Sequence, residues 1–214
     1  MSAIAAGFGD TIHDSQFCFR QLLTAMSQPG TLVELNLVQG FGHMMPASTQ
    51  VLLALADNST PVWLSEQFEH DVAVTENLNF HLGCSLLKSQ QHDIQKQANF
   101  ALIAEQDVAD FNWSQSQFYV GNEEYPDRST TVIVEVAGLS NQPCGSALHL
   151  SLTGPGIETE KPLFIQSHCF DSLNAMLTLR KTHRFPLGLD FIVVSGEQVV
   201  ALPRSTTVEV MPCM

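Results

Sequence analysis

The spacing of apolar residues predicts a helix near each end of the chain. The first helix carries its apolar positions near a 3.6-residue period: Phe17, Leu22, Leu23 and Met26, with Phe19 widening the stripe. Asp14 is the expected N-cap, and Gln-Pro-Gly at 28–30 ends the helix, because proline and glycine extend a helix poorly. The second helix covers 169–182 and gathers its apolar residues on one face: Phe170, Leu173, Met176 and Leu177. A shorter buried helix is expected over 49–56.

Short runs of alternating or β-branched residues predict strands separated by turns. The expected strands cover 31–37, 61–64, 99–104, 130–136, 147–152, 191–194, 199–202 and 206–210. Turns are expected at 57–60, at the Gly-Pro-Gly sequence 154–156, and at 195–198, where a hairpin would form. The segment 65–97 is polar and is expected to be irregular, with an exposed loop at 89–97. A weak helix or a loop is expected to run to about 117.

The order of these elements predicts the fold class. Helices interleave with strands early in the chain and strands cluster late, as in an α/β domain with a mixed β-sheet. No linker rich in proline, glycine or serine separates two halves, and there is no repeat or low-complexity tract. We therefore expect residues 1–214 to form a single domain, of a size at which the core needs no disulfide or metal to hold it.

The composition indicates a protein whose surface is partly covered by a partner. Hydrophobic residues make up 44% of the chain and charged residues only 14%, whereas charged residues are about 25% of an average domain. The chain has 22 acidic and 9 basic residues, a formal net charge of −13. A field of this sign repels nucleic acids and anionic membranes. We therefore expect protein partners, with no nucleic acid and no membrane among them.

Cysteine usage and the N-terminal sequence predict a cytoplasmic protein. The five cysteines are an odd number at wide, irregular spacings, without any Cys-x-x-Cys: Cys18, Cys84, Cys144, Cys169 and Cys213. This pattern favours free, mostly buried thiols over a disulfide framework. The first ten residues lack the basic and apolar stretches of a signal peptide, and the longest aliphatic run, 51–56, is too short to span a bilayer.

Motifs for metal binding or nucleophilic catalysis are absent or incomplete. The eight histidines form neither His-Glu-x-x-His nor a pair four residues apart, so no metal site is expected. Ser85-x-x-Lys88 matches the pattern of penicillin-binding enzymes but lacks the companion motifs. The turn at 154–156 matches no phosphate-binding loop. The acidic cluster at 123–127 is interpreted as a solvated or partner-facing loop rather than an acid–base pair.

The arginines are candidates for ligand or partner contacts because an acidic chain has only five of them. Arg204 follows Pro203 just after an apolar strand, and Arg128 lies beside acidic residues. An arginine fork pairs well with carboxylates and phosphates. Each of these arginines could therefore form a structural salt bridge, contact a partner protein, or bind a phosphorylated ligand. No catalytic residue can be assigned.

The lysines argue against pyridoxal phosphate, which requires a lysine for its Schiff base. Lys88 and Lys96 flank or lie in a polar loop, Lys161 precedes a proline, and Lys181 ends a helix. None of them has the sequence surroundings of a buried residue. No cofactor is therefore expected.

Five segments together resemble the PhnH family of carbon–phosphorus lyase subunits. They are FCFRQLLTAMSQPG (17–30), VLLALADNSTPVWLS (51–65), LTGPGI (152–157), FPLGLDFI (185–192) and LPRSTTVEV (202–210). Their order and spacing agree with the family across nearly the whole chain, whereas 66–127 matches less clearly. Any one segment is weak, but all five in the same order are specific.

The resemblance implies membership of the bacterial complex that activates alkylphosphonates. That complex displaces adenine from ATP and joins methylphosphonate to the ribose, which gives ribose 1-methylphosphonate 5-triphosphate. An iron–sulfur radical subunit later cleaves the carbon–phosphorus bond. Members of the family are homodimers, and the resemblance implies a three-layer fold similar to that of pyridoxal-phosphate-dependent transferases but without the cofactor site. The family offers no catalytic residue to transfer.

Our leading hypothesis is a non-catalytic, homodimeric subunit that docks on the radical subunit and helps the complex assemble. A second hypothesis is a ligand-binding or catalytic subunit that holds the phosphonate or the triphosphate through Arg128 or Arg204. A third is a degenerate pyridoxal enzyme that still binds the cofactor. As a component of a transferase complex, the chain is not expected to be catalytic alone.

Overall fold

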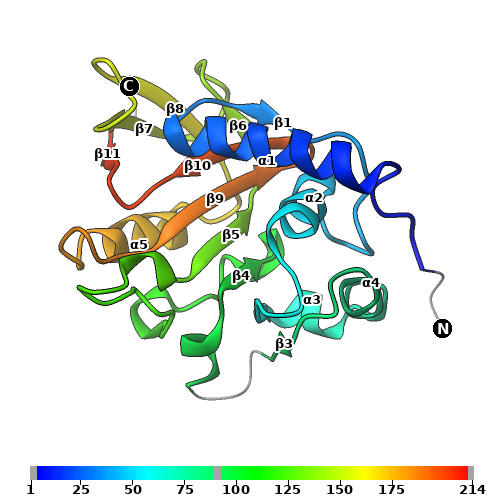
Figure 1. Cartoon of the computed structure of the whole chain (residues 1–214). Helices are drawn as coiled ribbons and strands as arrows, with labels where there is room; N and C mark the ends of the chain where they lie inside the picture. The colour runs from blue at the N-terminus through cyan, green and yellow to red at the C-terminus, as the bar shows by residue number, and fades with distance from the viewer. Residues whose placement is uncertain (1–3, 89–92, 212–214) are drawn as a thin grey trace.

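Two β-sheets organise the chain in the computed structural model, which describes residues 4–88 and 93–211. Within these residues, the larger sheet has seven strands in the order β1 (Val33–Glu34), β10 (Gln198–Leu202), β9 (Asp190–Ser195), β5 (Thr131–Glu135), β4 (Phe100–Ile103), β2 (Val62–Leu64) and β3 (Leu86–Leu87). The strands from β9 to β3 are parallel, whereas β10 and β1 run antiparallel to their neighbours at one edge. The larger sheet is therefore mixed (Figure 1).

The smaller sheet is antiparallel and lies between β5 and β9 in the sequence, except for its last strand. Its described strands follow the order β11 (Thr207–Val210), β7 (Leu148–Thr153), β8 (Lys161–Gln166) and β6 (Gly138–Ser140). Strand β11 follows β10 in the sequence, so the C-terminal part of the chain leaves the larger sheet and joins the smaller one. The expected three-layer arrangement and the likeness to pyridoxal-phosphate-dependent transferases stay predictions.

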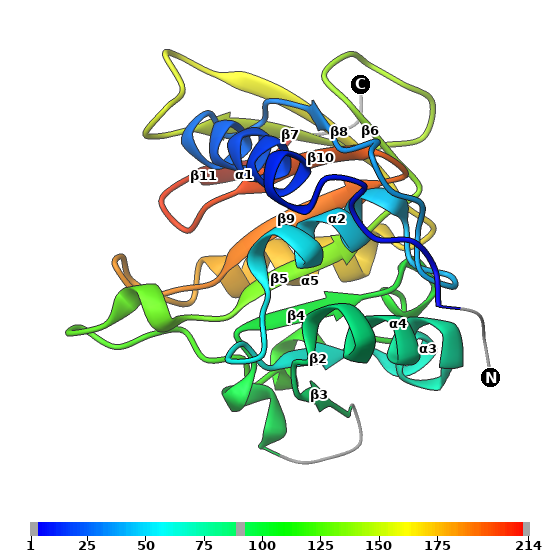
Figure 2. The same ribbon diagram turned by 45° about the vertical axis from the view of Figure 1, so that its right-hand side comes forward.

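The helices lie on both sides of the larger sheet. They are α1 (Thr11–Ser27), α2 (Pro46–Leu55), α3 (Glu66–His70), α4 (Val72–Leu82) and α5 (Phe170–Arg180), with 3-10 turns η1 (Ile94–Gln97), η2 (Glu105–Asp107), η3 (Trp113–Gln115) and η4 (Pro126–Arg128). Figures 1 and 2 show α1 and α2 in front of the sheet and α5 behind it. Within 4–88 and 93–211, none of these helices combines the length and the apolar character that crossing a membrane requires.

Each face of the larger sheet buries its own hydrophobic core, because successive residues of a strand point to opposite faces. Leu102 and Ile133 pack on the side of α1, α2 and α4. Trp63, Val132 and Phe191 pack on the side of α5 and the smaller sheet. The central strands β5 and β9 are therefore apolar on both faces, which accounts for their continuous runs of β-branched and aliphatic residues.

Helix α1 begins earlier than predicted. Its N-cap is Asp10, whose carboxylate accepts hydrogen bonds from the backbone N–H groups of Ile12 and His13 at 3.1 and 3.0 Å. Asp14, the predicted cap, lies inside the first turn and accepts a hydrogen bond from the N–H of Asp10 at 2.9 Å. The two carboxylates together satisfy three N–H groups at the start of the helix, which the helix itself leaves unpaired.

The apolar stripe predicted for α1 is wrong for three of its members. Phe17, Phe19 and Leu23 are 42%, 50% and 56% exposed. The residues that α1 buries are spaced four and three apart: Cys18, Leu22 and Ala25. Because apolar residues occur around most of this helix, hydrophobicity alone does not select its buried face, and the face that packs on α2 and β10 includes the smaller side chains.

The segment 65–97, which was predicted to be irregular, contains helices α3 and α4. Asp71 caps α4 by accepting a hydrogen bond from the N–H of Ala73 at 2.8 Å. Phe68, Val74 and Leu78 are fully buried and anchor the two helices on the larger sheet. The prediction was wrong because only a few apolar residues, separated by polar ones, mark the helical period here.

Most of the other predicted elements are confirmed. Strands β2, β4, β5, β7, β9, β10 and β11, helix α5 and the β9–β10 hairpin lie where the pattern places them. Of 31–37, only Val33–Glu34 pairs with a neighbour, and the helix expected at 49–56 begins at Pro46. Strand β8 was missed because Lys161 and Pro162 interrupt its apolar pattern.

The loop expected at 89–97 is described only in part. Residues 89–92 lie outside the described residues, and the rest of the segment includes η1. The weak helix or loop expected up to about 117 is found as the short turns η2 and η3. These turns connect β4 to the segment that leads into β5.

The predicted turn at 154–156 approaches the end of α1 closely. Gly156 has a φ of +83°, and a Cβ at this position would lie 2.0 Å from the carbonyl oxygen of Ser27. Only glycine combines this backbone conformation with the required space. The turn between β7 and β8 therefore ties the smaller sheet to α1.

A carboxyl group is buried in the core beside α2. Glu135, the last residue of β5, is 2% exposed. Its Oε1 accepts a hydrogen bond from the N–H of Met45, at the N-terminus of α2, at 2.8 Å. Burial raises the pKa of Glu135 to about 7, and the charge of Glu105 acts in the same direction. Glu135 therefore titrates near neutral pH.

We expect Glu135 to make the protein less stable as the pH rises from about 4.5 to about 7. The unfolded chain ionises this carboxyl near its ordinary pKa, whereas the folded protein keeps it protonated, so ionisation favours unfolding in this window. Glu135→Gln keeps an acceptor for the N–H of Met45 but cannot ionise. Relative to this variant, the wild type should lose up to about 3 kcal/mol of unfolding free energy across the window.

Urea unfolding of both proteins at several pH values across this window measures the difference. Glu34→Gln is the control, because Glu34 is exposed and its replacement should leave the pH dependence unchanged. Curves for Glu135→Gln and the wild type that run parallel over the whole range would show that Glu135 does not control this pH dependence.

Candidate functional site

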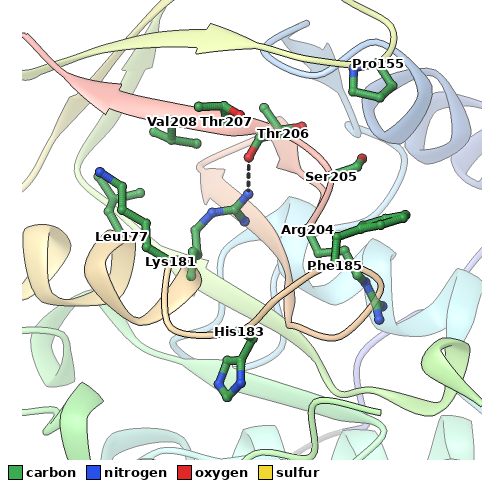
Figure 3. Close-up of a pocket in the computed structure, with 11 residues that line it drawn as sticks. Pro155, Leu177, Lys181, His183, Phe185, Arg204, Ser205, Thr206, Thr207 and Val208 are labelled. Atoms are coloured by element: carbon green, nitrogen blue, oxygen red, sulfur yellow. Dashed lines mark hydrogen bonds between the residues drawn. The ribbon is translucent and has the colours of Figure 1, made fainter. Parts of the chain in front are cut away.

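A pocket of about 410 Å³ lies where the C-terminal end of α5 meets the turn between β10 and β11 (Figure 3). Its basic lining residues are Arg180, Lys181, His183 and Arg204. Hydroxyl groups and apolar side chains complete the lining: Ser205, Thr206, Thr207, Pro155, Leu177, Phe185 and Val208. All 22 acidic residues lie in the described part of the chain, and none of them lines this pocket. The size is that of a small-molecule site.

Arg180, the last residue of α5, is a half-buried cation of the pocket. Its guanidinium donates hydrogen bonds to the carbonyl oxygens of Leu202, Pro203 and Thr206, the last two at 2.7 and 3.0 Å. Burial lowers the pKa of Arg180 to about 10, although the charge of Asp190 opposes the shift. Arg180 therefore stays charged at neutral pH and holds the β10–β11 turn through carbonyl oxygens.

Arg204 pairs with the carboxylate of Asp190 at the start of β9. Its Nε lies 3.2 Å from both oxygens of Asp190, and one terminal nitrogen donates to Asp190 and to the hydroxyl of Ser129. The other terminal nitrogen donates to the carbonyl oxygens of Pro126 and Pro186. Arg204 and Asp190 are each 14% exposed. Arg204 therefore uses all of its nitrogens within the protein, and its predicted contact with an anion or a partner stays a prediction.

Arg128 lies on the neighbouring turn η4 and is exposed. Its guanidinium carbon lies 4.0 Å from the ring centroid of Tyr125, a cation–π contact. Because Arg204 bonds to Pro126 and Ser129 on either side of Arg128, it holds the turn that presents Arg128. The structure thus joins the two predicted arginines through η4, although only Arg204 lines the pocket.

The sequence prediction missed Arg180. A basic residue at the end of an amphipathic helix is usually interpreted as a favourable interaction with the helix dipole, with its side chain in solvent. The available signal was the position of Arg180 three residues after Leu177, which is on the buried face of the same helix. That spacing indicates a side chain directed toward the core rather than away from it.

The remaining basic candidates lie outside the pocket, apart from Lys181. Lys88 is exposed, Lys96 pairs with Asp93 at 2.7 Å, and Lys161 donates a hydrogen bond to the hydroxyl of Thr31 at 2.6 Å. Within residues 4–88 and 93–211, no three His, Cys, Asp or Glu side chains lie close enough together to hold a metal ion.

The described cysteines are free thiols. Cys18 and Cys84 are buried, whereas Cys144 and Cys169 are half-buried, so the prediction of mostly buried thiols holds for two of these four. Burial raises the pKa of Cys18 to about 11. Cys18 is therefore a protonated core residue at neutral pH, and Cys213 lies outside the described residues.

Known proteins resemble this chain over nearly its whole length. The family model described as bacterial phosphonate metabolism protein (PhnH) matches residues 6–209. The PhnH subunit of alpha-D-ribose 1-methylphosphonate 5-triphosphate synthase from Rhizobium meliloti (strain 1021) is 31% identical over 208 residues, which cover 96% of this chain and 95% of the relative. The putative C-P lyase subunit protein HtxG from Stutzerimonas stutzeri is 30% identical over 192 residues, 89% of this chain and 84% of the relative. The resemblance carried by the five sequence segments is confirmed.

We expect Arg204→Gln to destabilise the fold by about 3 kcal/mol, because it leaves the carboxylate of Asp190, whose side chain is only 14% exposed, without its partner. The matched variant Arg128→Gln removes the same charge from an exposed position and should change stability by less than about 1 kcal/mol. Chemical unfolding of both variants and the wild type measures the losses. Equal losses for the two variants would contradict the structural role of Arg204.

Proposed function

This chain belongs to the PhnH family of bacterial phosphonate metabolism proteins, and on that premise we propose that it functions as a subunit of the carbon–phosphorus lyase core complex in alkylphosphonate catabolism. The observation that carries this proposal is the match of the family model to residues 6–209. The names of both relatives support it, because one is a synthase subunit and the other a putative C-P lyase subunit. In the complex, ATP and methylphosphonate give ribose 1-methylphosphonate 5-triphosphate.

Within the complex, the chain has an assembly role and carries no active site of its own. The bonding of Arg204 supports this role, because this candidate for a ligand contact is engaged with Asp190 and three other residues of the chain. The low charge content supports it as well, since a surface with few charged residues suits permanent contact with other subunits.

We also propose that the protein is cytoplasmic, pairs with a second copy of itself and docks on the radical subunit, as the family resemblance implies. We further propose that cells express the protein when they are starved of phosphate. The molar mass of the purified chain and of the purified complex tests self-pairing directly.

The outer side of α1 is the docking face that we propose for another subunit of the complex. Ile12, Phe19 and Leu23 are 66%, 50% and 56% exposed, and their spacing of seven and four residues places them along one side of the helix. Such a line of apolar side chains suits a partner helix with apolar residues at matching intervals. Arg20, on the same helix, would face an acidic residue of that partner.

A second candidate function is that the subunit holds the phosphonate or the triphosphate through arginines. The observation that favours it is the pocket beside α5, where Arg180 and Arg204 lie next to Lys181 without an acidic lining residue. This candidate does not compete with assembly, because the α1 face and the pocket use different residues.

We expect the wild-type chain, purified from phosphate-starved cells, to bring the other core subunits with it, and we expect Phe19→Asp to reduce their recovery at least about tenfold. A carboxylate in the centre of an apolar contact costs more than the 1.4 kcal/mol to which a tenfold loss corresponds. Phe80→Asp is the matched control, because Phe80 is also an exposed aromatic residue, 67% exposed, on the different helix α4.

Mass spectrometry identifies the recovered subunits, and circular dichroism confirms that both variants are folded. Failure of the wild type to recover any core subunit would contradict the proposed function. Equal recovery by Phe19→Asp and the wild type would instead exclude α1 as the docking face. If Phe19→Asp abolished self-pairing but not recovery of the other subunits, α1 would be the contact between two copies.

A further inference from the structure

We propose that the pocket between α5 and the β10–β11 turn binds a phosphate- or phosphonate-type anion attached to a small carbon group, with Lys181 as its direct contact. The proposed function guides only the choice of probes, because binding to the pocket is a property of the isolated chain. Three features of the pocket support this binding: the charge of its lining, the bonding of Arg180, and the exposed amine of Lys181.

The charge of the lining is opposite to that of the protein. The chain has 22 acidic and 9 basic residues, yet three of the basic residues and none of the acidic ones line this pocket. A hollow lined by one sign of charge and walled by apolar atoms concentrates its electrostatic potential. An anion that the rest of the surface repels is therefore attracted to this place.

Arg180 supplies charge that no carboxylate neutralises by direct contact. Its hydrogen-bond partners are the carbonyl oxygens of Leu202, Pro203 and Thr206, which carry partial charges only. The nearby carboxylate of Asp190 is paired with Arg204. Asp190 thus faces two guanidinium groups, which leaves one positive charge in excess beside the pocket. Bringing an anion next to a poorly solvated excess charge is favourable.

Lys181 is placed to contact that anion. It follows Arg180 at the end of α5, is exposed, and has no ion pair within the described residues. Figure 3 shows Lys181 on the α5 side of the hollow. Its ammonium group can therefore donate charge-assisted hydrogen bonds to an anion in the pocket.

The apolar side chains of the lining favour a ligand in which a carbon group is attached to the anion. Leu177 and Val208 line the pocket, and Phe185, which is 66% exposed, lies at its margin. Inorganic phosphate would leave these side chains uncovered, whereas a carbon group attached to the anion would bury apolar surface against them. The fit is to an organophosphonate or a phosphate ester.

Another pocket of the chain provides a comparison. It has a volume of about 420 Å³ and is lined by Glu66, Asp107 and Asp110 together with amide, hydroxyl and aromatic side chains. Its size is nearly the same, but three carboxylates in the lining would repel an anion. The pocket beside α5 is therefore the better candidate for anion binding because of the sign of its charge, not because of its size.

Calorimetric titration of the full, isolated chain with methylphosphonate, inorganic phosphate and ATP tests the proposal. We expect saturable binding of methylphosphonate or ATP with a dissociation constant of about 1 mM or lower, and weaker binding of inorganic phosphate. Lys181→Met should weaken binding about tenfold, because it removes a donor to a charged group.

Lys96→Met is the matched control, since it removes the same charge from an exposed lysine in η1, outside the pocket. Its affinity should equal that of the wild type. Tighter binding of methylphosphonate than of ATP would assign the site to the phosphonate, and the reverse order would assign it to the nucleotide.

No saturable binding of any probe, or equal weakening by Lys181→Met and Lys96→Met, would overturn the proposal. Tighter binding of inorganic phosphate than of both organic probes would overturn the role of the apolar lining. These binding results do not depend on whether the chain assembles with the other core subunits. If the chain bound methylphosphonate but recovered no core subunits, the proposed function would be refuted and anion binding by the pocket would stand. If it recovered core subunits but bound no probe, only anion binding by the pocket would be refuted.

Discussion

The ion pair between Arg204 and Asp190 holds together one end of the larger sheet. Asp190 begins β9, Arg204 follows β10, and the same guanidinium reaches Pro126 and Ser129 at the two ends of η4 and Pro186 before β9. Three segments of the chain, 126–129, 186–190 and the turn after β10, therefore meet at one planar cation, whose fixed fork of donors suits several acceptors at once. The β10–β11 turn leaves this point toward the smaller sheet, so the position of β11 and the shape of the pocket depend on the pair.

Because the chain is acidic and has few cations, the places where cations gather are important for its surface potential. Of the nine basic residues, Arg204 is paired with a carboxylate and Arg180 is bonded to carbonyl oxygens, both at the same end of the molecule. Elsewhere the excess of acidic groups sets the sign of the surface potential. A protein of this charge presents an electrostatically distinct region only where its cations are concentrated. The pocket beside α5 is such a region, because Arg180 and Lys181 line it and neither is paired with a carboxylate within the described residues.

The sequence pattern predicted the elements whose signal is local and missed those that depend on partners distant in the chain. Strands β5, β9 and β10 are runs of β-branched and aliphatic residues buried on both faces, and such runs are recognisable without a structure. The face of α1 was predicted wrongly because Phe19 and Leu23 are as apolar as Leu22, and only contact with β10 and α2 decides which is buried. The scarcity of arginine in the sequence made Arg204 a candidate for a ligand or partner contact. Its partners could not be predicted, since Pro126 and Ser129 lie more than 70 residues away.

The two partly buried arginines, Arg180 and Arg204, show why a residue type at a site does not by itself identify a ligand contact. An arginine paired with a carboxylate has its charge neutralised locally and its donors occupied, so it serves the fold even where it lines a pocket, as Arg204 does. An arginine bonded to carbonyl oxygens is held equally firmly, yet its full charge still acts on its surroundings, as in Arg180. Sequence alone treats the two as equivalent, because the distinction depends on which acceptor the fold brings to each guanidinium. The electrostatic character of the pocket is therefore a property of the assembled strands β9, β10 and β11 and the end of α5, and Arg180 rather than Arg204 is its source.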